Sequence, residues 1–156
     1  MRLTEILTED RVRVTRHRDG IRAKGEVLEA LAGLLATGTG QDAASIHKVL
    51  TDRENLQSTG IGDGVAIPHG SMDALETQTA AVLLCPEGID FHSIDGRPAK
   101  IVVGVIGPRR ATGEHLRMLA RISRLLRDGA LRDRLLEAPD GADAFGVIVE
   151  GEEGRP

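Results

Sequence analysis

The chain has 156 residues, a length that suits a single domain able to bury a core without disulfide or metal staples. It contains no Trp or Tyr and only two Phe, so it lacks the rings on which nucleobases stack, and its net charge of −4 provides no general attraction for nucleic acid or anionic membranes. The single cysteine excludes an internal disulfide and favours a reducing compartment.

The N-terminal residues alternate between apolar and charged side chains, which is not the pattern of a signal peptide. No run approaches the roughly 20 apolar residues that span a bilayer. We therefore expect a cytoplasmic protein with no nucleic-acid partner and no direct membrane insertion.

The first half of the chain predicts one strand and two helices. Residues 11–15 alternate in the manner of a short strand, and apolar residues at helical spacing predict helices over 23–36 and 41–51. The run 37–40, which contains two glycines, ends the first of these helices. The glycine-rich stretch 58–70 is interpreted as a loop with short extended pieces.

The second half carries the strongest strand and helix signals. Continuous apolar runs at 80–84 and 100–106 predict buried central strands, and Asp95-Gly96 between them is a hairpin-turn signal. The clearest helix covers 114–127, and its apolar residues, Leu116 included, are expected to face inward.

Short helices over 130–137 and 140–149 complete the expected fold. Helices on both sides of a group of apolar strands predict an α/β fold, a single-domain α/β sandwich with a mixed sheet flanked by helices. We expect the domain to cover residues 1–150 and the tail 151–156 to be disordered.

His69, in the sequence Pro68-His69-Gly70, is the most distinctive candidate for chemistry. A neutral imidazole is nucleophilic near pH 7 and accepts a phosphoryl group on its unprotonated nitrogen. Pro68 restricts the backbone leading to the histidine, and Gly70 presents no side chain to an approaching partner. An isolated histidine is more often structural, so the neighbouring residues decide between the two interpretations.

Several phosphate-binding candidates precede His69 in the chain. Arg53 offers a fork of donors that suits phosphate oxygens, and the hydroxyls of Ser58 and Thr59 could add further donors. Gly60, with Gly62 and Gly64, would let backbone N–H groups approach an anion closely, although these glycines form no dinucleotide-binding or Walker motif. Asp63 either orients an imidazole or is an ordinary turn residue.

His115 is the second histidine of interest because it falls in the first turn of the predicted helix 114–127. The partial positive charge of a helix N-terminus suits a nearby anion and disfavours an imidazolium. A packing role for His115 is the alternative.

Neither the histidines nor the cysteine forms a recognisable metal or nucleophile motif. No H-x-x-x-H or C-x-x-C spacing occurs, so no metal site is expected. Cys85 ends an apolar run and is expected to be buried rather than reactive.

Together these segments resemble the signature of the fructose/mannitol/nitrogen-type enzyme IIA domains of the bacterial phosphoenolpyruvate-dependent phosphotransferase system. The resemblance rests on Arg53-Glu54, on the run from Ser58 to Gly62, and on Ala66-Ile67-Pro68-His69-Gly70. It continues through Phe91, Asp95-Gly96 and His115-Leu116, and covers residues 3 to 148.

The resemblance implies an α/β sandwich in which His69 is phosphorylated and His115 and Arg53 are its active-site partners. The role of Asp63 is less defined, because the family carries an acidic or amide residue there. A histidine-phosphorylated carrier, HPr or its nitrogen-branch relative, would be the donor. The acceptor would be an enzyme IIB cysteine, or a kinase or ion transporter regulated through phosphorylation-dependent binding. Such a protein carries a phosphoryl group covalently rather than acting as a conventional turnover enzyme, and no cofactor is implied.

Three functional interpretations stay open. The 156 residues include no transporter, IIB or carrier domain, which favours a nitrogen-type regulator over a free-standing subunit of a sugar transporter. The third is a binding module that no longer transfers phosphate. The loop before His115 carries Arg109 and Arg110, which either are solvated or help an acidic partner to dock.

Overall fold

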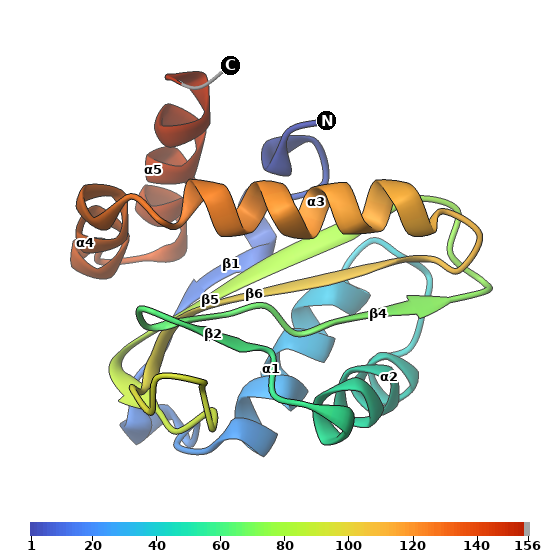
Figure 1. Ribbon diagram of the computed structural model, residues 1–156, viewed down its shortest axis with the longest axis horizontal. Coiled ribbons are helices and arrows are strands. Elements are labelled where there is room, and N and C mark those ends of the chain that lie inside the picture. Colours follow the sequence, from blue (N-terminus) through green and yellow to red (C-terminus); the bar gives the residue numbers. More distant parts are fainter. Residues whose placement is uncertain (155–156) are drawn as a thin grey trace.

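The computed structural model describes residues 1–154, which build one mixed sheet with helices on both faces (Figure 1). The strand order is β1-β5-β6-β3-β2, and β4 also pairs with β6. The strands are β1 (Val12–Val14), β2 (Gly60–Gly62), β3 (Val65–Ala66), β4 (His69–Met72), β5 (Thr79–Ile89) and β6 (Ala99–Pro108). The α/β sandwich expected from the sequence is confirmed.

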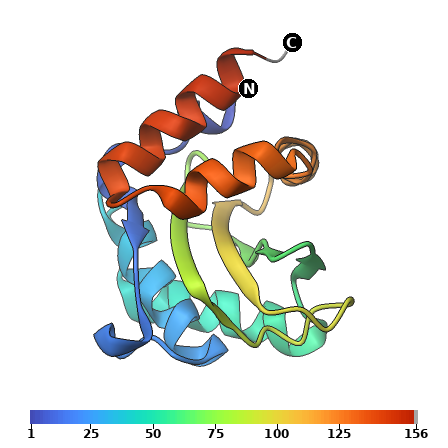
Figure 2. The same ribbon diagram turned by 90° about the vertical axis from the view of Figure 1, so that its left-hand side faces the viewer.

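Five α-helices cover the sheet, and three short 3-10 helices lie near the N-terminus. One face carries α1 (Lys24–Ala36) and α2 (Ala43–Leu56); the other carries α3 (Thr112–Leu125), α4 (Gly129–Glu137) and α5 (Gly141–Glu153), and Figure 2 shows the sheet between them. The 3-10 helices span Leu3–Glu5, Glu9–Arg11 and His17–Asp19. No helix within residues 1–154 is long and apolar enough to cross a membrane.

The two long strands, β5 and β6, form the centre of the sheet as an antiparallel pair. Their side chains alternate between two cores, as the period of two in a strand requires. Val103 and Val105 join the core under α3, whereas Val102 and Ile106 join the core under α1 and α2. Because both faces are covered, the two strands appear in the sequence as continuous apolar runs.

The segment that leads to His69 runs parallel to β6. β3 pairs Val65 with Ile101, and β4 pairs His69 with Val105. Val65 and Ile67 belong to the core under α3. His69 has the same parity, so its side chain also lies on the α3 face of the sheet.

The second predicted helix, 41–51, is longer than expected. Asp42 caps it by accepting a hydrogen bond from the Ser45 N–H, and the helix continues to Leu56. The last turn has no apolar periodicity, but it is anchored by Glu54, which is buried and ion-paired with Lys24 at 3.1 Å. Arg53 therefore lies in a helix and not in a loop.

The prediction that the tail is disordered is wrong for residues 151–153, which complete α5. Glu152 is only 1% exposed, and its carboxylate accepts hydrogen bonds from the N–H groups of Leu3 and Thr4 and from Arg121. These contacts tie the C-terminal turn to the N-terminal segment, a pairing that local sequence does not reveal. Residues 155–156 lie outside the described residues.

Leu116 also departs from expectation. It is 60% exposed, whereas its helical neighbours Met118 and Ile122 are buried. Leu116 lies one position beyond His115, about 100° around the helix, and that rotation turns its side chain toward solvent. An exposed leucine therefore flanks the histidine.

Candidate functional site

His69 begins β4 and is held in one orientation by its own backbone. Its Nδ1 lies 2.7 Å from the carbonyl oxygen of Ile67. A carbonyl can only accept, so Nδ1 carries the proton and donates it to Ile67, which assigns the tautomer. Nε2 then holds the lone pair and is the nitrogen available for chemistry.

The surroundings of His69 favour its neutral form. Burial lowers the pKa of the ring below the ordinary value of 6.5, and the positive charge of Arg53 lowers it further, while the Ile67 carbonyl and the carboxylate of Glu54 act in the opposite direction. The net lowering keeps Nε2 unprotonated near pH 7. A neutral, partly accessible imidazole with a fixed tautomer is suited to nucleophilic attack.

His115 lies beside His69, although the two are 46 positions apart in the chain. The ring centroids are 5.6 Å apart and the ring planes are tilted by 53°. His115 is 7% exposed, and neither of its ring nitrogens has a hydrogen-bond partner among residues 1–154. Burial, and then the nearby charge of His69, lower its pKa. A neutral imidazole needs one N–H donor, so His115 holds a polar hydrogen with nothing to receive it.

Arg53 reaches the site from the last turn of α2. One guanidinium nitrogen, Nη1, donates to the carbonyl oxygen of Gln57 at 2.8 Å and so caps the helix end. The charge of Arg53 lowers the pKa of His69, which places the guanidinium in the electrostatic surroundings of the ring. The remaining N–H groups of its fork are suited to an anion on His69.

A chain of hydrogen bonds connects Glu54 to His69. The buried carboxylate of Glu54 accepts the N–H and the hydroxyl of Thr59, and the carbonyl of Thr59 accepts the N–H of Ile67 at 3.0 Å. The carbonyl of Ile67 in turn holds His69 Nδ1. Sequence reasoning did not place Glu54 among the site residues, although Arg53-Glu54 is part of the family-like signature.

The hydroxyls expected to bind phosphate have other partners. The Thr59 hydroxyl donates to Glu54, and the Ser58 hydroxyl donates to the carbonyl of Phe91 and accepts the N–H of Gly60. Gly60 packs against Ser93, whose Oγ would lie 2.2 Å from any Cβ at this position. These three residues therefore shape the segment that supports His69, and their polar groups are not left open to an anion.

Asp63 is not brought to His69. It is exposed at the tip of the β2–β3 hairpin, with a φ of 57°, and its N–H donates to Asp95. Along β6, the Gly64 carbonyl bonds at Ile101 whereas His69 lies opposite Val105. Four residues of strand separate these points by about 13 Å, so Asp63 is a turn residue.

Gly70 has a packing role that the sequence did not suggest. A Cβ at Gly70 would lie 2.3 Å from Cγ1 of Val49 on α2. The missing side chain faces α2 and not the side from which a partner would approach His69. The glycine therefore lets α2 pack closely against β4, which in turn positions the strand that carries His69.

The two loop arginines are both engaged at the surface. Arg109 pairs with Asp73 at 3.3 Å, with both side chains mostly exposed, and Arg110 donates to the carbonyl of Leu75. They connect the loop before α3 to the loop after β4, and exposed pairs of this kind contribute little to stability.

Neither the cysteine nor the acidic residues suggest another chemistry. Cys85 is buried, as expected, and burial raises the pKa of its thiol to about 12. No group of three or more His, Cys, Asp or Glu side chains within residues 1–154 is placed to hold a metal ion.

Comparison with known proteins gives consistent matches. Residues 5–151 match the family model of the phosphoenolpyruvate-dependent sugar phosphotransferase system, EIIA 2. The chain is 38% identical over 129 residues to a nitrogen regulatory protein of Bradyrhizobium diazoefficiens, covering 83% of this chain and 84% of that protein. It is 34% identical over 113 residues to the fructose-specific EIIA component of Haloferax volcanii, covering 72% and 73%.

A solved structure agrees with these matches. The nitrogen regulatory protein IIA-Ntr of Neisseria meningitidis superposes with a TM-score of 0.83 at 28% identity, over 92% of this chain and 97% of that one. With a family model that matches almost the whole chain, this protein belongs to the EIIA type 2 family of the phosphoenolpyruvate-dependent sugar phosphotransferase system.

Proposed function

We propose that this chain is a phosphoryl carrier that accepts a phosphoryl group on Nε2 of His69 from a histidine-phosphorylated carrier protein. One observation carries the proposal: His69 has its Nδ1 bonded to Ile67, and within the described part of the chain neither its Nε2 nor the ring of the adjacent His115 has a hydrogen-bond partner. In the transfer the N–P bond of the donor histidine breaks as a new N–P bond forms at Nε2.

Roles for the neighbouring residues follow from this geometry. Transfer of a phosphoryl group between two nucleophiles needs positioning and charge stabilisation more than covalent help. Arg53 would offset the negative charge that arrives, about −1.5 to −2 units for a phosphoryl group. His115 would donate its unpaired N–H to a phosphoryl oxygen, which relieves the cost of leaving that donor unsatisfied.

Exposed apolar side chains flank the proposed site on two sides. Leu116 follows His115 on α3, and Leu56, which is 83% exposed, ends the helix that carries Arg53. Large exposed apolar residues around a polar centre suit a protein partner that docks transiently. The phosphoryl donor and the acceptor would dock on this surface one after the other.

The proposed acceptor is a protein regulated through phosphorylation-dependent binding, as in a nitrogen-type IIA. The similarity to nitrogen regulatory proteins in both sequence and structure supports this choice. The 34% identity to a fructose-specific EIIA component favours a second candidate, transfer to the cysteine of a IIB domain in a sugar transporter. Either role places the protein in the cytoplasm, where a single cysteine stays reduced.

A labelling experiment tests the proposal. The protein is incubated with radiolabelled phosphoenolpyruvate, enzyme I and a histidine-phosphorylatable carrier, and acid-labile phosphate is measured. Wild type and His92→Ala, which alters an exposed histidine, should be labelled equally, whereas His69→Ala should not be labelled. Full labelling of His69→Ala would contradict the site, and an unlabelled wild type would favour a module that binds without transferring phosphate.

The two acceptors are separated by a second experiment. Labelled protein is mixed with a fructose-type IIB domain, and label on the IIB cysteine is followed over time. Rapid transfer would assign the chain to sugar transport. Retention of the label, together with a partner kinase or ion transporter that binds only one phosphorylation state, would assign it to regulation.

A further inference from the structure

Unpaired polar atoms are concentrated at one place in the core. Four buried side-chain nitrogen or oxygen atoms lack a hydrogen-bond partner among residues 1–154. Three of the four belong to Gln78 and His115: the amide oxygen Oε1 and both ring nitrogens. Buried polar groups without partners are rare and each costs about 1–3 kcal/mol, so their occurrence in two side chains requires an explanation.

Gln78 and His115 border the same point above β6. A Cβ placed on Gly107 would lie 3.0 Å from Cγ of Gln78 and 3.3 Å from Nδ1 of His115. Gly107 therefore leaves open a space that both side chains border, and Nδ1 is the atom of His115 nearest to it. Both residues are more than nine-tenths buried.

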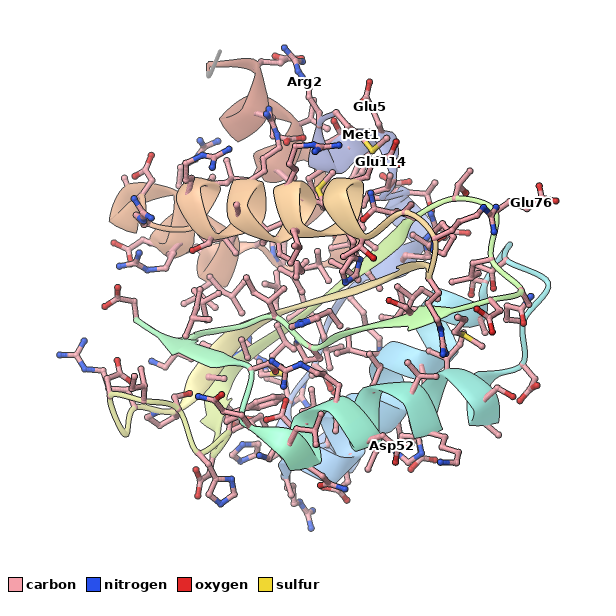
Figure 3. The ribbon with its side chains drawn as sticks, turned by 45° about the vertical axis from the view of Figure 1, so that its right-hand side comes forward. Met1, Arg2, Glu5, Asp52, Glu76 and Glu114 are labelled. Carbon is pink, nitrogen blue, oxygen red and sulfur yellow. The ribbon has the colours of Figure 1, made fainter. Side chains whose placement is uncertain are left out.

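On the side away from His115, Gln78 borders a surface pocket with different hydrogen-bonding groups. Gln78 lines this pocket along α3 with Glu114, Arg117, Arg121 and Arg124; Figure 3 shows Glu114 there next to Met1. Arg121 pairs with Glu152, whereas Arg117 has no partner within residues 1–154. Three arginines face one carboxylate in the pocket, so hydrogen-bond donors predominate on that side, whereas the His115 side offers a ring nitrogen that can accept.

We infer that Gln78 is a positioning residue for His115: its amide nitrogen donates to Nδ1, and its amide oxygen faces the arginines of the pocket. The two ends of a carboxamide have the same shape, so their hydrogen-bonding partners decide the orientation. With the nitrogen inward, the buried amide and Nδ1 satisfy each other. In the structure Oε1 and Nδ1 form no hydrogen bond, whichever ring nitrogen carries the proton, so the pairing also requires the amide to turn toward the ring.

This pairing fixes where His115 carries its proton. When Nδ1 accepts a hydrogen bond, the neutral ring must be protonated at Nε2. His115 is then a pre-set donor of an Nε2–H bond toward a phosphoryl group on His69, with no proton to rearrange during transfer. This consequence rests on the proposed function, whereas the Gln78–His115 pairing itself does not.

Nitrogen NMR of the histidine rings tests the pairing without any phosphate. At a pH where His115 is neutral, its ¹⁵N shifts should show the Nε2–H form in wild type. Gln78→Glu offers only acceptors, so His115 should change to the Nδ1–H form. Gln41→Glu, a matched change in the loop before α2, should leave the rings as in wild type. An unchanged Nε2–H form in Gln78→Glu would overturn the pairing.

Transfer kinetics test the consequence. Gln78→Met keeps the length of the side chain but cannot donate, and should slow labelling of His69 by about tenfold, the effect of one hydrogen bond to a charged group. The thermal midpoint and the tautomer of His69 should stay close to wild type. An unchanged labelling rate would overturn the positioning role. If wild type were never labelled while Gln78→Glu still switched the tautomer, the proposed function would fail and the pairing would stand.

Discussion

The rings of His69 and His115 lie 5.6 Å apart, centroid to centroid, and only one of them has a hydrogen-bond partner among residues 1–154. The partnered ring, His69, presents a lone pair, and the unpartnered ring, His115, holds an unused donor. A group that bonds to the first and accepts from the second would satisfy both. A phosphoryl group has this combination of an electrophilic phosphorus and acceptor oxygens.

His115→Ala should slow phosphorylation of His69 by about 10- to 100-fold, because a hydrogen bond to a charged group is worth about 1.5–3 kcal/mol. In the unphosphorylated protein the change removes only the inferred bond from Gln78, so circular dichroism should show the native fold. The measurement is the labelling rate at a fixed donor concentration, with His92→Ala as the control. If the variant transfers phosphate at the wild-type rate both onto and off His69, His115 has no part in the mechanism.

Stability should fall as the pH drops below about 6.5. The pKa values of His69 and His115 are both lowered in the folded state, mainly by burial. Below 6.5, the ordinary value, the unfolded chain therefore takes up protons that the folded rings resist, which favours unfolding. The stabilising contribution is complete above 6.5 and is lost toward the folded-state pKa values.

Urea unfolding at several pH values measures this dependence. The variant His69→Ala/His115→Ala should have a flatter stability profile between pH 7.5 and 5.5 than wild type. His92→Ala should keep the wild-type slope, since its ring is exposed. A double variant with the wild-type slope would show that neither ring is responsible for the dependence.

Glu54→Ala should destabilise the fold by about 2–3 kcal/mol, less than for a fully buried pair because Lys24 is 21% exposed. It removes the partner of Lys24 and the acceptor of Thr59, and so loosens the hydrogen bonds that lead to Ile67 and His69. The His69 tautomer, measured by ¹⁵N shifts, should become mixed.

Asp52→Ala is the matched control for Glu54→Ala. Asp52, which is labelled in Figure 3, lies on the same helix. It pairs with Lys48, and both side chains are exposed. Its loss should cost less than about 0.5 kcal/mol and leave His69 unchanged. Equal effects of the two substitutions would show that burial of Glu54 has no part in holding the site.

The sequence predicted the elements whose patterns are local. The apolar runs that became β5 and β6, and the periodicity of α3, depend on neighbouring residues and were located to within a few positions. The final turns of α2 and α5 were missed because they depend on distant partners. Glu54 meets Lys24, 30 positions away, and Glu152 meets Leu3, 149 positions away.

The site residues also fall into two groups, those that local sequence marks and those that depend on distant partners. Histidine chemistry and a family-like motif single out His69 and His115, and the structure brings their rings together. The sequence left the role of Asp63 open and offered the Ser58 hydroxyl to phosphate, because the partners of these residues, Asp95 and Phe91, come from a loop about 30 residues later. Gln78 has no motif at all, and only its burial beside His115 draws attention to it.

Gly70→Ala should destabilise the protein by about 1–3 kcal/mol, because the new Cβ would lie 2.3 Å from Cγ1 of Val49. The clash pushes β4 away from α2 and moves His69, so labelling should also slow. Val49→Ala removes the opposing methyl group and should restore much of both losses in the double variant. Urea unfolding and labelling rates of the two single variants and the double variant measure the coupling, which should exceed 1 kcal/mol. Additive effects would mean that β4 accommodates the methyl group without α2, and that Gly70 is not what sets the distance between the helix and the strand that carries His69.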